Sequence, residues 1–320
     1  MEKKKFFELI PPDTNINFVG FLRPALVISI VLIVISLALL LVRGPEYGID
    51  FAGGSLVQVR FAKPQQTDDV RKAVESLDIP TPEIQDLGGQ HIEFLIRIAL
   101  VESVQSEEMS QRVINGLSAA FPDDKPEVLR NEAVGPRVGE ELRRKAIMAL
   151  FFATLMIGLY IWIRFEWRFA VGTAVALLHD VIIVVGMLII FGYEFNLNIV
   201  ASLLTVVGFS VNDKVVVSDR IRENRRKNQR APLATVINSS INETLSRTIL
   251  TNGTTFLASL ALFMFGGSVL HGFAFALVVG SIIGTYSSVY IASTIILLFE
   301  RQRVQPMAQA ARKKAGARSA

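Results

Sequence analysis

NIVASLLTVVGFSVNDKVVVSDRIRENRR, residues 198–226, decides the class of fold to which this chain belongs. The stretch starts as an apolar run long enough to cross a bilayer, and Asn212, Asp213 and Lys214 lie inside that run. An Asp or Lys at the centre of a spanning helix costs about 2.5–3.5 kcal/mol, so such a residue normally faces other helices or a wet cavity. The stretch therefore predicts a membrane helix with a functional group at Asp213.

A second charge, Arg247, opens the next apolar run, RTILTNGTTFLASLALFMF (residues 247–265). Because consecutive spans run in opposite directions, Asp213 and Arg247 are expected at similar depths in the membrane. A carboxylate that either pairs with an arginine or binds a proton has two charge states with different packing, which is what coupling of proton movement to conformational change requires. We predict that the two residues form a proton relay. The alternatives are a static ion pair between two helices, or charges that reach the membrane interface.

Further polar residues near this pair are candidates for a supporting role. Asn212 and Lys214 flank Asp213 in the sequence, and Thr251 follows Arg247 one helical turn later on the same helix face. Their position next to the predicted relay is the reason to include them.

His179 and Asp180 lie in the middle of the preceding apolar run. In that position they can act as relay groups or shape a water-filled route. The alternative is a hydrogen-bonded packing pair that uses a Ser or Asn on a neighbouring helix.

Small residues recur every four positions in the last apolar run, with Gly280 and Gly284 at its centre. Such a ridge lets two helix backbones approach closely. We predict a helix-packing role for the two glycines and no substrate contact.

The composition limits the function classes. The chain has 320 residues, of which 51% are hydrophobic, and its mean hydropathy is +0.43. It has no cysteine and three scattered histidines, which argues against disulfides and metal sites. We find no nucleophile–base pair and no cofactor motif, so we expect neither an enzyme nor a cofactor. The net charge of +4 is modest and its basic clusters fit membrane topology, so nucleic-acid binding is not expected.

Hydropathy along the chain predicts a polytopic α-helical membrane protein with six spans. The predicted spans are residues 22–42, 146–163, 169–192, 197–217, 247–266 and 270–299. The positive-inside rule assigns the Arg-rich links 164–168 and 218–246 to the cytoplasm. Segment 1–21 and the basic tail 300–320 are then cytoplasmic as well, and segment 43–145 is extracytoplasmic.

Segment 43–145 is typical of an inserted α+β domain. We expect a strand around 57–61, a helix at 67–77, strands at 82–87 and 92–98, a helix at 104–121 and a strand at 127–134. This βαββαβ order is typical of a ferredoxin-like domain. The glycine-rich stretch YGIDFAGGS (47–55) precedes a strand and no P-loop Lys-Ser/Thr follows it, so it predicts a tight turn and no nucleotide site.

Four motifs together resemble the SecF-type members of the SecD/SecF family, in the RND superfamily of proton-driven transporters. They are GIDFAGG (48–54), LLHDV (177–181), VVGFSVNDKVVVSDRIREN (206–224) and LSRTILTNGTT (245–255). The resemblance covers nearly the whole chain. It implies half of an RND-type bundle, in which Asp213 and Arg247 match the intramembrane residues tied to proton transport. Lys214 departs from the small hydroxylated residue that is usual there, which leaves its effect on Asp213 open.

The resemblance also implies partners and a location. The chain is expected in the bacterial inner (plasma) membrane, with segment 43–145 in the periplasm, as a partner of SecD, the SecYEG translocon, YajC and the translocating preprotein. The implied function is use of the proton-motive force, with protons as the coupling ion, to promote preprotein export. A passive structural subunit of the translocon and half of an RND-type small-molecule exporter are the alternatives.

Overall fold

The computed structural model describes residues 14–77, 79, 82–87, 89–98, 106–164 and 167–316. Most of the predicted cytoplasmic segment 1–21, and the last four residues of the predicted tail, lie outside the described residues, as do the side chains of 300–316. The chain divides into two compact units. The helical unit comprises Met1–Gly44, Leu150–Tyr193 and Ala201–Ala320, and the α/β unit comprises Pro45–Ala149 and Glu194–Val200.

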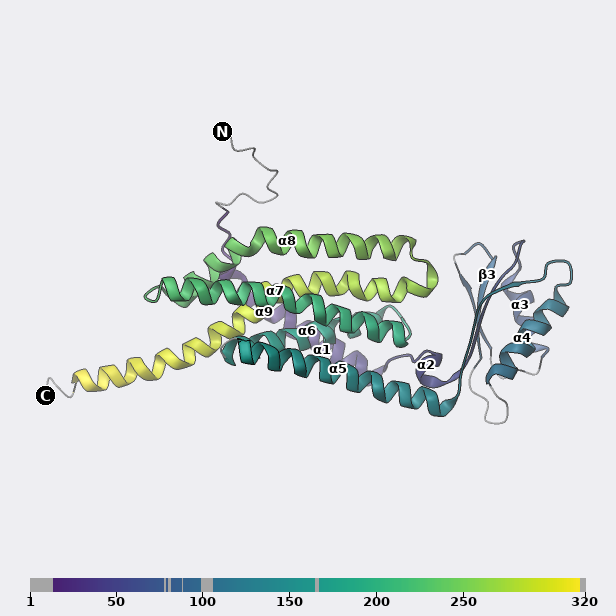
Figure 1. Ribbon diagram of the computed structural model, residues 1–320, viewed down its shortest axis with the longest axis horizontal. Coiled ribbons are helices and arrows are strands. Elements are labelled where there is room, and N and C mark those ends of the chain that lie inside the picture. Colours follow the sequence, from purple (N-terminus) through teal and green to yellow (C-terminus); the bar gives the residue numbers. More distant parts are fainter. Residues whose placement is uncertain are drawn as a thin grey trace, which may run out of the picture. The chain divides into compact units, whose positions relative to one another are not determined.

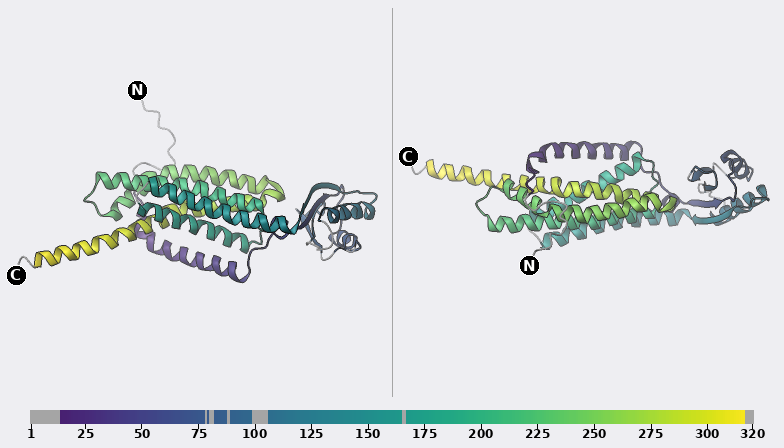
Figure 2. Two further views of the ribbon diagram at one scale, coloured as in Figure 1. Left: turned by 60° about the horizontal axis from the view of Figure 1, so that its bottom comes forward. Right: turned by 90° about the horizontal axis from the view of Figure 1, so that it is seen from above.

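Six helices in the described chain are long and apolar enough to cross a membrane. They are α1 (Leu22–Val42), α5 (Pro136–Arg164), α6 (Trp167–Ile190), α7 (Leu197–Lys227), α8 (Leu233–Phe265) and α9 (Gly267–Gly316), and a short 3-10 helix, η1 (Val19–Phe21), precedes α1. Figures 1 and 2 show that α6 to α9 run side by side. The prediction of a polytopic helical protein with six spans is confirmed.

Several helices are longer than the apolar runs that predicted them. Helix α8 starts at Leu233 and not at residue 247, α7 continues to Lys227, and α9 continues to Gly316, into the predicted basic tail. The reason is that hydropathy marks only the lipid-embedded part of a helix. Ala, Arg, Gln, Glu and Lys are good helix formers, so the helix continues through the charged ends.

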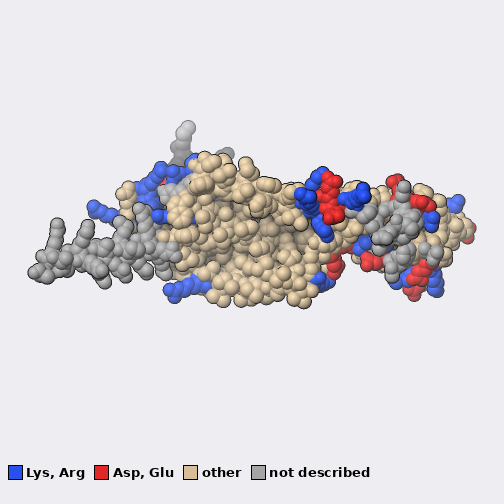
Figure 3. All heavy atoms as spheres, turned by 90° about the horizontal axis from the view of Figure 1, so that it is seen from below, with Lys and Arg blue, Asp and Glu red and all other residues tan. Residues whose placement is uncertain are grey.

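Burial separates the central helices from the peripheral ones. In their most apolar segments, 56% of α6 and 50% of α9 lie buried inside the structure, compared with 17% of α1 and 6% of α5. Helix α6 packs against both α1 and α9. On the face drawn in Figure 3, the middle of the helical unit shows no charged side chain, and Lys and Arg lie at both ends of this apolar band. An apolar band of this kind suits the hydrocarbon core of a bilayer.

The α/β unit contains a four-stranded antiparallel sheet in the order β2-β3-β1-β4. The strands are β1 (Gly54–Arg60), β2 (Glu83–Leu87), β3 (Glu93–Ile98) and β4 (Glu127–Val134), with helices α3 (Thr67–Glu75) after β1 and α4 (Ser106–Ala120) after β3. This connectivity confirms the ferredoxin-like βαββαβ prediction. The first two residues of the predicted helix 104–121 lie outside the described residues.

The core of the α/β unit follows from the alternation of residues along the strands. Val57 and Val59 of β1 and Phe94 and Ile96 of β3 are fully buried, since alternate side chains of a strand point to the same face. The apolar faces of α3 and α4 cover them. The glycine-rich stretch forms a one-turn helix, α2 (Ile49–Ala52), that ends at glycines with positive φ, where only a turn was predicted.

Candidate functional site

Asp213 is buried in α7 and is held by one hydrogen bond from α8. Asp213 is 6% exposed. Thr248 Oγ1 donates a hydrogen bond to Asp213 Oδ1 over 2.6 Å. The other carboxylate oxygen, Oδ2, has no hydrogen-bond partner within the part of the chain that the structure describes. A buried polar atom without a partner is unfavourable, and native structures contain few of them. This oxygen is therefore available to a proton or a water molecule.

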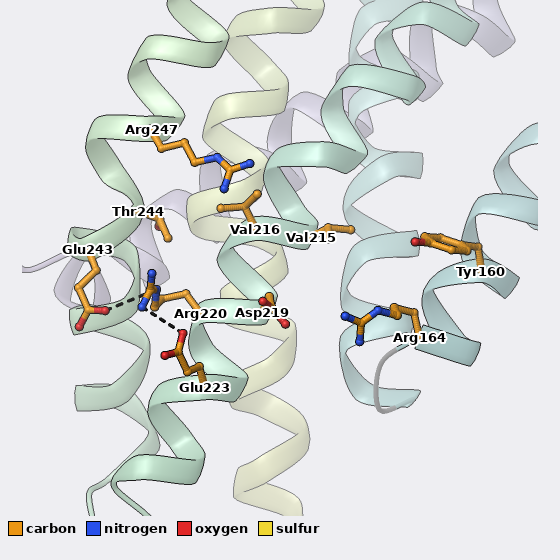
Figure 4. Close-up of a pocket in the computed structure, with 10 residues that line it drawn as sticks. All are labelled: Tyr160, Arg164, Val215, Val216, Asp219, Arg220, Glu223, Glu243, Thr244 and Arg247. Carbon is orange, nitrogen blue, oxygen red and sulfur yellow. Dashed lines mark ion pairs between the residues drawn. The ribbon is translucent and has the colours of Figure 1, made fainter.

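Arg247 directly precedes Thr248, the residue that contacts Asp213, but the described ion pairs include none between Arg247 and Asp213. Arg247 is exposed, and its guanidinium reaches from α8 toward Val216 of α7 (Figure 4). The ion pairs of the described residues include none between Asp213 and Arg247, so the structure does not show the static ion pair that was the alternative, and the relay stays a prediction. The reason is that successive residues on a helix point about 100° apart, and Thr248 takes the position that faces Asp213.

The Arg247 side chain lines a polar pocket between α5, α7 and α8, with a volume of about 340 Å³. The lining residues, drawn in Figure 4, are Tyr160, Arg164, Val215, Val216, Asp219, Arg220, Glu223, Glu243, Thr244 and Arg247. Arg220 forms ion pairs with Glu223, over 3.1 Å, and with Glu243, over 3.6 Å. Val216 and Thr244 each lie about one helical turn from Asp213 and Thr248 respectively. Polar surface thus reaches to within one turn of the buried carboxylate.

Lys214 is fully buried and pairs with a different carboxylate, that of Asp180 in α6. Its Nζ lies 2.7 Å from Asp180 Oδ2 and 2.6 Å from Ser210 Oγ. Ser210 also donates to Asp180 Oδ2 over 2.7 Å. Lys214 is 0% exposed and Asp180 is 1% exposed, so the pair is shielded from water. Although Lys214 follows Asp213 in the sequence, its ammonium group pairs with Asp180 of α6.

His179 extends this cluster to α1 and α9. Its Nδ1 lies 3.0 Å from Asp180 Oδ1, and its Nε2 lies 3.1 Å from Ser29 Oγ in α1. Ser29 Oγ is 3.0 Å from the hydroxyl of Tyr286 in α9, whose ring stacks on the imidazole. The network therefore ties four helices together through buried polar atoms, with a serine partner of the kind that the packing interpretation of the His-Asp pair required.

Gly280 and Gly284 lie where α9 crosses α7. A Cβ atom on Gly280 would clash with the Val206 side chain, and one on Gly284 would lie 2.8 Å from Ser210 Oγ. Glycine at both positions therefore lets α9 approach α7 closely. The lack of a side chain at Gly284 also leaves room for the Ser210 hydroxyl that bridges Lys214 and Asp180.

The remaining predicted residues, Asn212 and Thr251, are exposed in this structure. The polar residues that α8 does bury were missed: they are Ser240, Thr244, Thr248, Asn252 and Ser259. Most of them recur four positions apart, so this buried polar stripe was recognisable in the sequence. It is offset by one residue from the predicted stripe, which contains Arg247 and Thr251. The sequence offered two such stripes on α8, and only packing distinguishes the buried one.

The site offers no evident metal ligands. Among the described residues there is no group of three or more His, Cys, Asp or Glu side chains that could hold a metal ion. The chemistry available at the buried carboxylates is therefore hydrogen bonding, ion pairing and proton exchange.

Known proteins have sequences similar to this chain over most of its length. The family model described as protein export membrane protein SecD/SecF, C-terminal, matches residues 97–302, and the SecD/SecF GG motif matches residues 38–65. The protein translocase subunit SecF of Calditerrivibrio nitroreducens is 45% identical over 93% of this chain and 99% of its own length. That of Rhodothermus marinus is 44% identical over 89% of this chain and 93% of its own length.

A solved structure is similar as well. The crystal structure of SecDF, a translocon-associated membrane protein from Thermus thermophilus, matches with a TM-score of 0.81 and 37% identity. The match covers 92% of this chain and 40% of that longer chain. Sequence and fold agree across both units, and this chain belongs to the SecD/SecF family of protein-export membrane proteins.

Proposed function

We propose that this Sec protein-export subunit is driven by protons and works as one half of a unit whose other half is SecD. In this proposal the proton-motive force drives a conformational change that promotes passage of a preprotein through the SecYEG translocon, with YajC as a further partner. Protons are the coupling ion, and the subunit itself is neither an enzyme nor a holder of a cofactor.

The observation that carries the proposal is the half-satisfied carboxyl group of Asp213. Its Oδ2 atom has no hydrogen-bond partner among the described residues, while Oδ1 accepts from Thr248. A hydroxyl group can donate to a carboxylate and accept from a carboxylic acid, so Thr248 can bind both protonation states. Gain or loss of the proton changes which contacts are favourable, and helix packing responds to that change.

The polar pocket supports a route between Asp213 and the cytoplasm. Its charged lining, with Asp219, Glu223 and Glu243 as acids and Arg247 at its inner end, suits water and mobile protons. Arg247 then acts as a positive charge at the end of the route, without a direct contact to Asp213. A charge that crosses the membrane potential is worth about 2.3 kcal/mol per 100 mV, enough to shift a two-state helix arrangement.

Two observations support a SecD-like partner. The longer SecDF relative of Thermus thermophilus joins a region similar to this chain with further sequence, and this chain spans 40% of its length. In addition, α7 and α8 expose Asn212, Arg247 and Thr251 inside apolar helices. Exposed polar groups within a bilayer are unfavourable, so these faces call for a partner helix or water.

The proposed location is the inner membrane, with both termini in the cytoplasm and the α/β unit in the periplasm. The Lys- and Arg-rich C-terminal ends of α7 and α9, together with Arg164 and Arg168 around the link from α5 to α6, support this orientation by the positive-inside rule. This orientation matters for the mechanism, because the polar pocket then lies on the cytoplasmic side, toward which the proton-motive force drives protons.

The test is the rate of preprotein export into inner-membrane vesicles that contain SecD, measured against an imposed proton gradient. Asp213→Asn keeps the shape of the side chain and removes titration, so we expect export to lose its dependence on the gradient. Arg247→Met should reduce that dependence, and Asp69→Asn, an exposed carboxylate of the α/β unit, is the control. Gradient-dependent export that survives in Asp213→Asn would instead favour the passive structural subunit.

A further inference from the structure

Of the described residues, two carboxylates are buried, Asp180 and Asp213, and their surroundings are opposite. Asp213 has one hydrogen bond and one open oxygen. Asp180 has partners at both oxygens: His179 at Oδ1, and Lys214 and Ser210 at Oδ2. The contrast indicates that the two acids have different roles.

The charges of the Asp180 cluster add up to zero when the carboxyl group is ionised. Lys214 supplies one positive charge and Asp180 one negative charge. His179 can donate from Nδ1 to Asp180 and accept at Nε2 from Ser29, so the neutral imidazole satisfies both contacts. A buried ion pair persists when its geometry is good and further hydrogen bonds satisfy the remaining atoms, as they do here.

Every helix packed around Asp180 contributes a neutral group or the one compensating cation. From α1 comes Ser29, which reaches Asp180 through His179, and from α9 comes Tyr286, whose hydroxyl lies 3.0 Å from Ser29 Oγ. On α7, Lys214 and Ser210 contact it directly, while the neighbouring acid Asp213 turns to Thr248 of α8. Protonation of Asp180 would therefore leave a fully buried ammonium group without a counter-charge.

We infer that Lys214 is a positioning residue that keeps Asp180 ionised and fixed between α6 and α7, so that Asp213 is the buried carboxyl group of this chain that exchanges protons. The inference rests on the proposed function only where it assigns proton exchange to Asp213. The ionised state of Asp180 follows from its contacts alone. Because of this contact with Lys214, the two buried acids, Asp180 on α6 and Asp213 on α7, have different roles.

The experiment is infrared difference spectroscopy of the full chain, co-purified with SecD in lipid nanodiscs, as the pH is changed. The C=O stretch of a protonated carboxyl group reports each buried acid that titrates. In the unsubstituted chain we expect the band of one buried acid, which Asp213→Asn removes and Asp180→Asn leaves. In Lys214→Met a second band should appear, and the additional substitution Asp180→Asn should remove it.

Two further variants separate positioning from general damage to the fold. Lys214→Arg keeps the charge and should show no second band. The double variant Lys214→Met with Asp180→Asn has no buried charge left in the cluster and should melt closer to the unsubstituted chain than Lys214→Met does. The inference is overturned if Asp180→Asn removes the band of the unsubstituted chain, or if Lys214→Met gives no second band. Export that stays gradient-dependent in Asp213→Asn would overturn the proposed function and leave this inference standing.

Discussion

Thr248 determines how Asp213 sits in the membrane, since it provides the one hydrogen bond that the described residues give to this carboxyl group. Thr248, which contacts Asp213, was not singled out in the sequence, whereas its neighbour Arg247 was. That Asp213 lies in a long apolar helix, and that the following helix lies next to it, were both predictable from apolar runs interrupted by charges. Which of two neighbouring residues faces the acid depends on the rotation of α8 about its axis, and hydropathy carries no information on that rotation.

Replacing Thr248 by valine keeps the shape of the side chain and removes the hydrogen bond to Asp213. A buried group that loses its hydrogen-bond partner costs about 1–3 kcal/mol, so we expect Thr248→Val to destabilise the protein by about that amount. Thr248→Ser should be nearly neutral, because the hydroxyl remains. Thermal melting in detergent measures both, with the exposed Thr251→Val as the matched control on the same helix. Equal melting of Thr248→Val and Thr251→Val would contradict the assignment.

The contact of Lys214 is a second feature that the sequence could not predict. Its position in the sequence, next to Asp213, suggested an effect on that acid, yet its amino group lies 2.7 Å from Asp180, 34 positions away. Only the packing of α6 against α7 brings the two together.

At the scale of elements, the crossing of α7 and α9 depends on glycine. Gly280 meets Val206, and Gly284 meets the Ser210 hydroxyl that contacts the buried ion pair. The small-residue ridge was visible in the sequence, because its period matches one helix face. The helix on which it packs was not visible, since many apolar faces can accept such a ridge.

Gly280→Ala adds a methyl group that would lie 2.4 Å from a Val206 methyl group. Overpacking of this kind typically destabilises by about 1–3 kcal/mol. Gly253→Ala on α8 is the matched control, because nothing lies within 4 Å of its added Cβ. In a helix the control change should stabilise by about 0.5–1 kcal/mol. Melting temperatures in detergent test both, and combining Gly280→Ala with Val206→Ala should recover part of the loss.

In the α/β unit, Asp124 fastens the chain that follows β1. Its carboxylate accepts hydrogen bonds from the backbone amides of Ala62 and Lys63, each over 3.0 Å, and from the Gln65 side chain over 2.9 Å. Partial burial raises the pKa of Asp124, but these hydrogen bonds outweigh it and hold the pKa below its ordinary value. The carboxylate therefore stabilises the fold wherever it is ionised.

The sign of the pH dependence follows from the lowered pKa of Asp124. The stabilisation is fully present above the unfolded-state value of about 3.9 and is lost as the pH falls through the lower pKa of the folded state. We expect Asp124→Asn to speed amide hydrogen exchange at Ala62 and Lys63 at pH 7, with the difference shrinking below pH ~4. Asp123→Asn, which leaves these hydrogen bonds in place, is the control. A difference that grows toward low pH would contradict this account.

For the whole molecule, the six spans and the inserted domain were predictable, because both depend on patterns that run along the chain: hydropathy, basic links and strand alternation. The part of the chain that the structure describes leaves polar residues exposed on two of its membrane helices. Asn212 on α7 and Thr251 on α8 are exposed, whereas the exposed residues of α1 and α5 are largely apolar and suit lipid. The asymmetry indicates on which side a partner binds.

Cysteine cross-linking tests this assignment on the assembled complex. We expect Asn212→Cys and Thr251→Cys to form cross-links to SecD in inner-membrane vesicles. Ile35→Cys on α1, which is equally accessible but lies among apolar residues, should form none. The reverse pattern would place the partner on the α1 side and leave the polar faces of α7 and α8 to water.

The Lys214–Asp180 pair also constrains how this protein is made. Each charge alone would resist leaving the insertion channel for lipid, by about 2.5–3.5 kcal/mol at the middle of a helix. Only a short link separates α6 from α7. If the two segments leave together as a hairpin, lysine and aspartate neutralise each other before either meets hydrocarbon. We therefore expect α6 and α7 to leave the insertion channel as a pair, because release of either one alone would expose an uncompensated charge to lipid.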